Sequence, residues 1–87
     1  MKITGFLWLD EIIEKLAQKH RVEPYEVEEL FDGKPKFRFV ENGHRDGEDV
    51  YAVLGQTEAG RYLIAFFVRK GDGRALPVSA RDMTKSE

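Results

Sequence analysis

The segment GHRDGEDVY, residues 43–51, contains the side chains best suited to proton transfer. His44 and Glu48 lie four positions apart in it, a spacing that spans a turn and lets the two groups approach each other. A histidine with a reference pKa of about 6.5 takes up or releases a proton near neutrality. Cleavage of RNA through its 2′-hydroxyl needs a base, a cation for the phosphorane charge and an acid for the leaving oxygen. His44 or Glu48 together with arginines would supply these groups. The plainer interpretation of the segment is a charged hairpin loop.

Three arginines at strand positions are candidates for the cations of such a site. Alternation along residues 61–69 places Arg61 and Arg69 on one face, and alternation along 74–81 places Ser79 and Arg81 on one face. If the two faces coincide, the three guanidinium groups surround one concave surface and offer planar forks of donors to phosphate. Arginines at strand ends are more often solvated or paired with carboxylates, so both interpretations stay open.

Two helices are expected ahead of these residues. In residues 9–20 apolar side chains recur at helical spacing, with Asp10 as the expected N-cap and cations near the end. In residues 22–34, Pro24 suits a first helical turn and Gly33 suits a left-handed C-terminal position. This pattern predicts a second, shorter helix.

After the second helix the apolar period changes from 3.6 to 2 and predicts four strands, at residues 36–40, 49–55, 61–69 and 74–81. Their short connections favour antiparallel neighbours. The strand 61–69 is apolar on both faces and is expected to be central. Pro77 predicts that the last strand lies at an edge or contains a bulge. The expected fold is α+β, with two N-terminal helices packed on a four-stranded antiparallel sheet.

Length and composition exclude several classes of protein. A chain of 87 residues, 41% hydrophobic and 34% charged, predicts a single domain over residues 1–87. No apolar stretch approaches the about 18 residues of a membrane span, and the N-terminus does not read as a secretory signal, so a cytoplasmic protein is expected. With no cysteine and two distant histidines, neither a metal site nor another cofactor is predicted.

The net charge of −2 hides an asymmetry along the chain. Residues 10–32 contain eight acids and three bases, whereas residues 33–81 contain nine bases and six acids. The half that is predicted to form the sheet is therefore the half that attracts phosphate.

The order of these features resembles that of the BrnT family of bacterial toxins. Matching motifs run through nearly the whole chain: an early aromatic pair, a KH pair followed by valine, a phenylalanine closing the second helix, H-x-x-G-E, a glycine, GR with a following leucine, and SAR. They are Phe6 and Trp8, Lys19 to Val22, Phe31, His44 to Glu48, Gly55, Gly60 to Leu63, and Ser79 to Arg81.

This resemblance implies a ribonuclease of a type II toxin–antitoxin pair, with a fold similar to that of RelE-type toxins. It implies an RNA substrate and a cognate antitoxin, a small DNA-binding protein that neutralises the toxin in a hetero-oligomer. The implied catalytic residues are His44, Glu48, Arg61 and Arg81, and the implied RNA-binding residues are Arg69 and Ser79.

Two other functions stay open. Ile12 and Val50 stand where the family pattern has cations, and the total charge is acidic. A non-catalytic member of the fold that binds an antitoxin-like regulator fits these features. A small domain unrelated to RNA is the third interpretation.

The residues TKSE (84–87) have the form of a capping box, with Thr84 as N-cap and Glu87 reaching back to it. A helix start without a helix gains little stability, because nucleation costs more than one turn returns. We therefore expect a shortened form of the chain, whose residues 82–87 are poorly ordered unless a neighbouring chain holds them.

Overall fold

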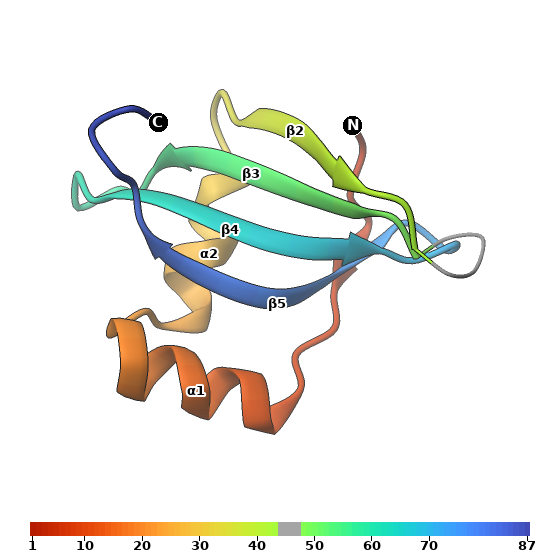
Figure 1. The fold of residues 1–87 in the computed structure, drawn as a ribbon, viewed down its shortest axis with the longest axis horizontal. Helices are drawn as coiled ribbons and strands as arrows, with labels where there is room; N and C mark the ends of the chain where they lie inside the picture. Colours follow the sequence, from red (N-terminus) through yellow and green to blue (C-terminus); the bar gives the residue numbers. More distant parts are fainter. Residues whose placement is uncertain (44–47) are drawn as a thin grey trace.

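The computed structural model describes residues 1–43 and 48–87 (Figure 1). The elements are β1 (Gly5–Phe6), α1 (Asp10–His20), α2 (Pro24–Leu30), β2 (Lys36–Glu41), β3 (Val50–Gln56), β4 (Tyr62–Arg69) and β5 (Arg74–Asp82). Two helices followed by a sheet confirm the α+β class. Within the described ranges, no helix is long and apolar enough to cross a membrane.

The sheet has five strands in the order β1-β5-β4-β3-β2. Neighbours are antiparallel except β1 and β5, which pair in parallel through Gly5 with Arg74 and Phe6 with Ala75. The prediction of four antiparallel strands is therefore wrong, because the sheet is mixed and contains a fifth strand. β1 is two residues long, too short to show an alternating pattern in the sequence. Only its contact with the last strand of the chain makes it a strand.

The helix ends combine local signals with tertiary contact. α1 has no side-chain cap, and the predicted N-cap Asp10 is instead its first residue. Its negative charge interacts favourably with the helix dipole there. Arg21 ends α1 in a left-handed conformation with φ of 53°. In α2, Pro24 occupies the first turn as predicted, and Glu23 and Glu26 form a reciprocal capping box. The left-handed turn at Arg21 leaves the last carbonyl groups of α1 open to a donor from elsewhere.

The core lies between the two helices and one side of the sheet, which we call the helix face. Phe67 of β4 is fully buried at its centre, and its ring centroid is 5.2 Å from that of Phe31 and 6.2 Å from that of Phe37. Leu16 of α1 and Leu30 of α2 pack into the same cluster. β4 lies between β3 and β5 with half of its residues buried, which confirms its predicted central position.

Both helices pack on the helix face, which leaves the opposite side of the sheet, the open face, without a helix in the described part of the chain (Figure 1). A smaller cluster of Ala52, Leu54 and Ile64 is buried on the open face and is flanked by Phe66 and Met83. Polar side chains of β2 to β5 that point to this side are not covered by either helix.

Candidate functional site

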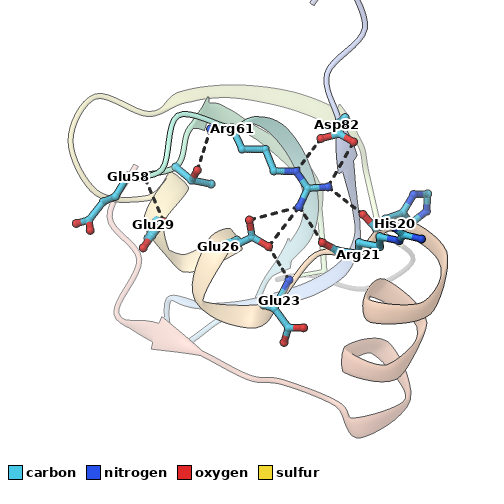
Figure 2. Close-up of polar contacts among 9 residues, drawn as sticks. His20, Arg21, Glu23, Glu26, Glu29, Glu58, Arg61 and Asp82 are labelled. Carbon is cyan, nitrogen blue, oxygen red and sulfur yellow. Dashed lines mark hydrogen bonds and ion pairs between the residues drawn. The ribbon is translucent and has the colours of Figure 1, made fainter.

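Arg61, which directly precedes β4, connects both helices to the end of the sheet (Figure 2). Its Nε donates a hydrogen bond to Asp82 Oδ1 at 2.8 Å. Its Nη1 and Nη2 donate to the carbonyl oxygens of Arg21 (2.8 Å) and His20 (2.9 Å) at the end of α1. Nη1 also lies 3.3 Å from Oε1 of Glu26 in α2. The side chain therefore points to the helix face and joins three elements there.

The groups around Arg61 hold it in its charged form. Its hydrogen bond to Asp82 is the main cause of a raised pKa for Arg61, and the same bond lowers the pKa of Asp82. Each of its three guanidinium nitrogens has an acceptor within the protein. Such a saturated guanidinium stabilises the fold and is poorly placed to bind a phosphate.

Arg81 lies on the other side of the sheet because β5 contains a bulge. Pro77 and Ser79 pair with successive residues of β4, so Val78 is an extra residue between them. An extra residue exchanges the faces of all following positions, and it turns Ser79 and Arg81 to the open face. Without it they would share the helix face with Arg61. Of the two alternatives for Pro77, the bulge is confirmed, and the edge position is wrong because β5 lies between β1 and β4. The interpretation that Arg61 and Arg81 share one surface is also wrong.

Arg69 also belongs to the helix face. It pairs with Ala75, a buried core residue, and its Nη2 donates to the carbonyl oxygen of Lys2 at 3.4 Å. Its Nε is buried and has no hydrogen-bond partner among residues 1–43 and 48–87. Of the three arginines expected around one surface, the structure brings Arg81 alone to the open face.

Side chains on the open face form transverse rows across four strands. The strand registers align one row of Lys36, Leu54, Ile64 and Arg81. They align a second row of Arg38, Ala52, Phe66 and Ser79. The first row thus has a cation at each end, and the second has Arg38 at its β2 end and Ser79 at its β5 end. Apolar and aromatic side chains lie between these ends.

Arg81 lies over the ring of Phe66, with 5.9 Å from its central carbon to the ring centroid. Its Nη1 and Nη2 donate to the two carboxylate oxygens of Glu87 at 2.8 and 2.9 Å. Hydrogen bonds from Arg81 and then from the Thr84 backbone lower the pKa of Glu87 to about 2. The bond to Glu87 in turn raises the pKa of Arg81. A carboxylate therefore occupies the fork of Arg81 that would match a phosphate.

Residues 84–87 form a turn beside Arg81. The backbone N–H of Thr84 donates to Glu87 Oε1 at 2.7 Å, which is the reach-back contact of the predicted capping box. The N–H of Glu87 donates to the carbonyl oxygen of Thr84 at 3.1 Å. Poor order of residues 82–87 stays a prediction.

Glu48 lies at the other end of the open face. Its Oε1 is 3.9 Å from Nζ of Lys70, and both residues line a cleft of about 340 Å³ whose apolar wall includes Val68. Ile64 is in the row of Arg81, and the six residue steps from Ile64 along β4 to Lys70, which follows the strand, span about 20 Å. Glu48 and Arg81 are therefore far apart, and the cation beside Glu48 is Lys70. His44 lies outside the described residues.

Three cations of the open face, Lys36, Arg38 and Lys70, lie outside the sequence motifs. Alternation in KFRF (36–39) carries a signal for the first two, because it puts both on one side of a strand. Lys70 gives no such signal, since its approach to Glu48 depends on how β3 and β4 pair. In the described ranges, no cluster of three or more His, Cys, Asp or Glu side chains is arranged to hold a metal ion.

Comparison with protein families identifies one family whose model covers most of the chain. A family model described as "Ribonuclease toxin, BrnT, of type II toxin-antitoxin system" matches residues 8–87. The match includes both helices and strands β2 to β5, and so all the residues of the open face described above. No curated protein matches the chain. The likeness to RelE-type toxins stays a prediction.

Proposed function

We propose that this chain, which belongs to the BrnT family of ribonuclease toxins of type II toxin–antitoxin systems, is an endoribonuclease that binds RNA on the open face. One observation carries the proposal: cations stand at both margins of an apolar and aromatic surface that neither helix covers. Lys36 and Arg38 stand at the β2 margin and Arg81 at the β5 margin, with Phe66 between them. Cations bind backbone phosphates, and aromatic rings stack on bases.

We assign proton transfer to the cleft at Glu48. The Glu48 carboxylate removes the proton of a 2′-hydroxyl, and the 2′-oxygen attacks the adjacent phosphorus. The bond to the 5′-oxygen breaks, and this oxygen takes up a proton, which leaves a 2′,3′-cyclic phosphate and a 5′-hydroxyl end. Lys70, 3.9 Å from Glu48, offsets the phosphorane charge. We assign the role of proton donor to His44 on the basis of the sequence. It directly follows Gly43, which lines the same cleft.

We assign a binding role to Arg81 and Ser79. Arg81 binds a phosphate of the same RNA strand once Glu87 has been displaced from its fork, and Ser79 offers a hydroxyl in the row of Phe66. We assign Arg61 and Arg69 to the fold, because both point to the helix face.

Membership of a type II toxin–antitoxin family implies an antitoxin partner. We further propose that this partner is a small DNA-binding protein that forms a hetero-oligomer with the chain and neutralises it. The cytoplasm is the compartment that such a pair requires, since the RNA targets are there.

RNA cleavage by the purified chain tests the proposal. Glu48→Gln should abolish cleavage and retain RNA affinity, because a base is lost and no cation is removed. Arg81→Ala should weaken RNA binding and lower the slope of log affinity against log salt by about 0.7, the contribution of one phosphate on a single strand. Cleavage by Glu48→Gln at the rate of the unaltered chain would remove Glu48 from the mechanism.

A non-catalytic, antitoxin-binding member is the second candidate, and the closed Arg81–Glu87 pair favours it. Induction in cells with RNA integrity followed in parallel separates the two. Growth arrest with fragmented RNA supports the ribonuclease. Normal growth and intact RNA, together with a stable complex with the protein encoded by an adjacent antitoxin gene, supports the binding protein.

A further inference from the structure

A second cleft, of about 270 Å³, lies on the open face at the end opposite Glu48. It lies between β2, β3, β4 and the segment that follows β5, and we call it the Tyr62 cleft. It is lined by Lys36, Arg38, Leu54, Gly55, Gln56, Tyr62, Met83 and Glu87. The carboxylate of Glu87 is paired with Arg81, whereas the two cations are at the β2 side. The proposed function uses Lys36 and Arg38 as cations at the β2 margin and leaves Tyr62, Leu54 and Met83 without a role.

The floor of the Tyr62 cleft is apolar and one wall is aromatic. Leu54 belongs to the buried cluster of the open face, and Met83 packs against that cluster. Tyr62 is 60% exposed, although it stands beside this apolar floor. A tyrosine in this position offers a flat ring to a ligand at little cost in entropy, and nucleic-acid bases stack on such rings.

Two cations stand at the β2 margin of the same cleft. Lys36 pairs with Leu54 and Arg38 pairs with Ala52 across the sheet, so both belong to the open face. Neither forms an ion pair with any residue in the ranges 1–43 and 48–87. Unpaired cations beside an apolar pocket are suited to a ligand that is anionic on one side and flat on the other, which describes a nucleotide.

The cleft lies in line with Arg81. Lys36 and Arg81 stand at the two ends of one row, three strand spacings or about 14 Å apart. An extended strand that crosses the sheet can therefore contact Arg81 through one phosphate and the β2 cations through another. In a duplex the bases stack on each other and are closed to Tyr62, so the geometry selects an unpaired nucleotide.

We infer that the Tyr62 cleft binds one nucleotide of single-stranded RNA that flanks the Arg81 contact, with the base stacked on Tyr62 and the phosphate held by Lys36 and Arg38. This inference rests on the proposed function, and it makes Tyr62 a residue that selects for unpaired RNA. It also assigns the substrate strand a path from β2 across the sheet toward β5.

Binding of a fluorescent, cleavage-resistant 2′-O-methyl RNA single strand, compared with its duplex, tests the inference. Tyr62→Ala should weaken binding of the single strand about 5- to 150-fold, the equivalent of the about 1–3 kcal/mol that stacking one base contributes. Tyr62→Phe, which keeps the ring, should retain the affinity. Lys36→Gln with Arg38→Gln should lower the salt slope by about 0.7, because one phosphate contact is lost.

Tyr25 provides a matched control. It is also 60% exposed but lies on α2, away from the open face, so Tyr25→Ala should leave RNA binding unchanged. Thermal unfolding of each variant checks that it is folded. If Tyr62→Ala does not fold, Tyr62→Leu keeps apolar bulk, lacks the flat ring, and should show the same loss of affinity.

The outcomes separate this inference from the proposed function. If the unaltered chain neither binds nor cleaves RNA, the proposed function is wrong and the inference falls with it. If the unaltered chain binds RNA and Tyr62→Ala binds it as well as Tyr25→Ala does, the cleft is not a nucleotide site, although the function stands. If Tyr62→Ala weakens antitoxin binding and leaves RNA affinity unchanged, the cleft is a protein interface and the inference is overturned.

Discussion

Replacement of Arg61 separates a structural role from a role in RNA cleavage. The side chain donates to Asp82, to two carbonyl oxygens at the end of α1, and to Glu26. Arg61→Ala removes all of these contacts, so we expect it to destabilise the fold by loosening α1 and α2 from the sheet. Arg61→Lys keeps the charge but lacks the fork, and should recover a minor part of the loss.

The expected magnitude follows from the exposure of the partners. Hydrogen bonds to charged groups contribute about 1.5–3 kcal/mol each in partly buried surroundings. Here the Arg61 side chain is 27% exposed and that of Asp82 is 66% exposed, so the contribution of this pair is reduced by solvent screening. We expect a total loss of about 2–4 kcal/mol. At about 4–8 °C per kcal/mol for a chain of this size, the thermal midpoint should fall by roughly 10–30 °C.

Thermal and urea unfolding measure this loss, and Arg74→Ala is its control. Arg74 pairs with Asp72 while 45% exposed, so its loss should leave the thermal midpoint nearly unchanged. Because Arg61 lowers the pKa of Asp82 below 3.8, the difference between the unaltered chain and Arg61→Ala should be full above that pH and shrink as the pH falls below it. A normal midpoint for Arg61→Ala combined with lost RNA cleavage would refute the structural assignment and return Arg61 to the catalytic site.

Three further predictions follow from other contacts. Glu87→Gln should raise RNA affinity by freeing Arg81, and it should lower the thermal midpoint because the ion pair is lost. Since the pKa of Glu87 is about 2 in the fold, the stability from this pair is present above pH 4.5 and lost as the pH falls toward 2. Equal midpoints of variant and unaltered chain at pH 7 would contradict the stabilising role of the pair. Phe67→Ala should cost about 3–5 kcal/mol in urea unfolding because Phe67 is fully buried, with a smaller cost for Phe67→Leu; a loss below 1 kcal/mol would show that Phe67 is not central to the core. Gly73→Ala should destabilise the fold by at least about 1 kcal/mol, since φ is +92° and an added Cβ would lie 2.9 Å from Thr4 Cγ2. An unchanged thermal midpoint would show that this turn and Thr4 accommodate the side chain.

Much of the fold follows from local pattern. The 3.6-residue period places both helices, and the alternation of residues 36–81 places four strands close to their observed bounds. The apolar side chains on both faces of residues 61–69 predict the central strand, and β4 lies between β3 and β5 in the structure. β1 is missing from this prediction, since two residues carry no period and the strand exists through pairing with β5.

The sequence by itself determined the family and the positions of the helices and main strands. It also determined that Ser79 and Arg81 lie on one face of their strand, as do Arg61 and Arg69. Only the tertiary structure decided which of these side chains meet. One extra residue at Val78 turns Arg81 away from Arg61, and the pairing of β3 with β4 puts Lys70 beside Glu48. Parity within a strand is a local property of the backbone, whereas the register between strands is set by long-range pairing, and a shift of one residue moves a side chain to the other face of the sheet.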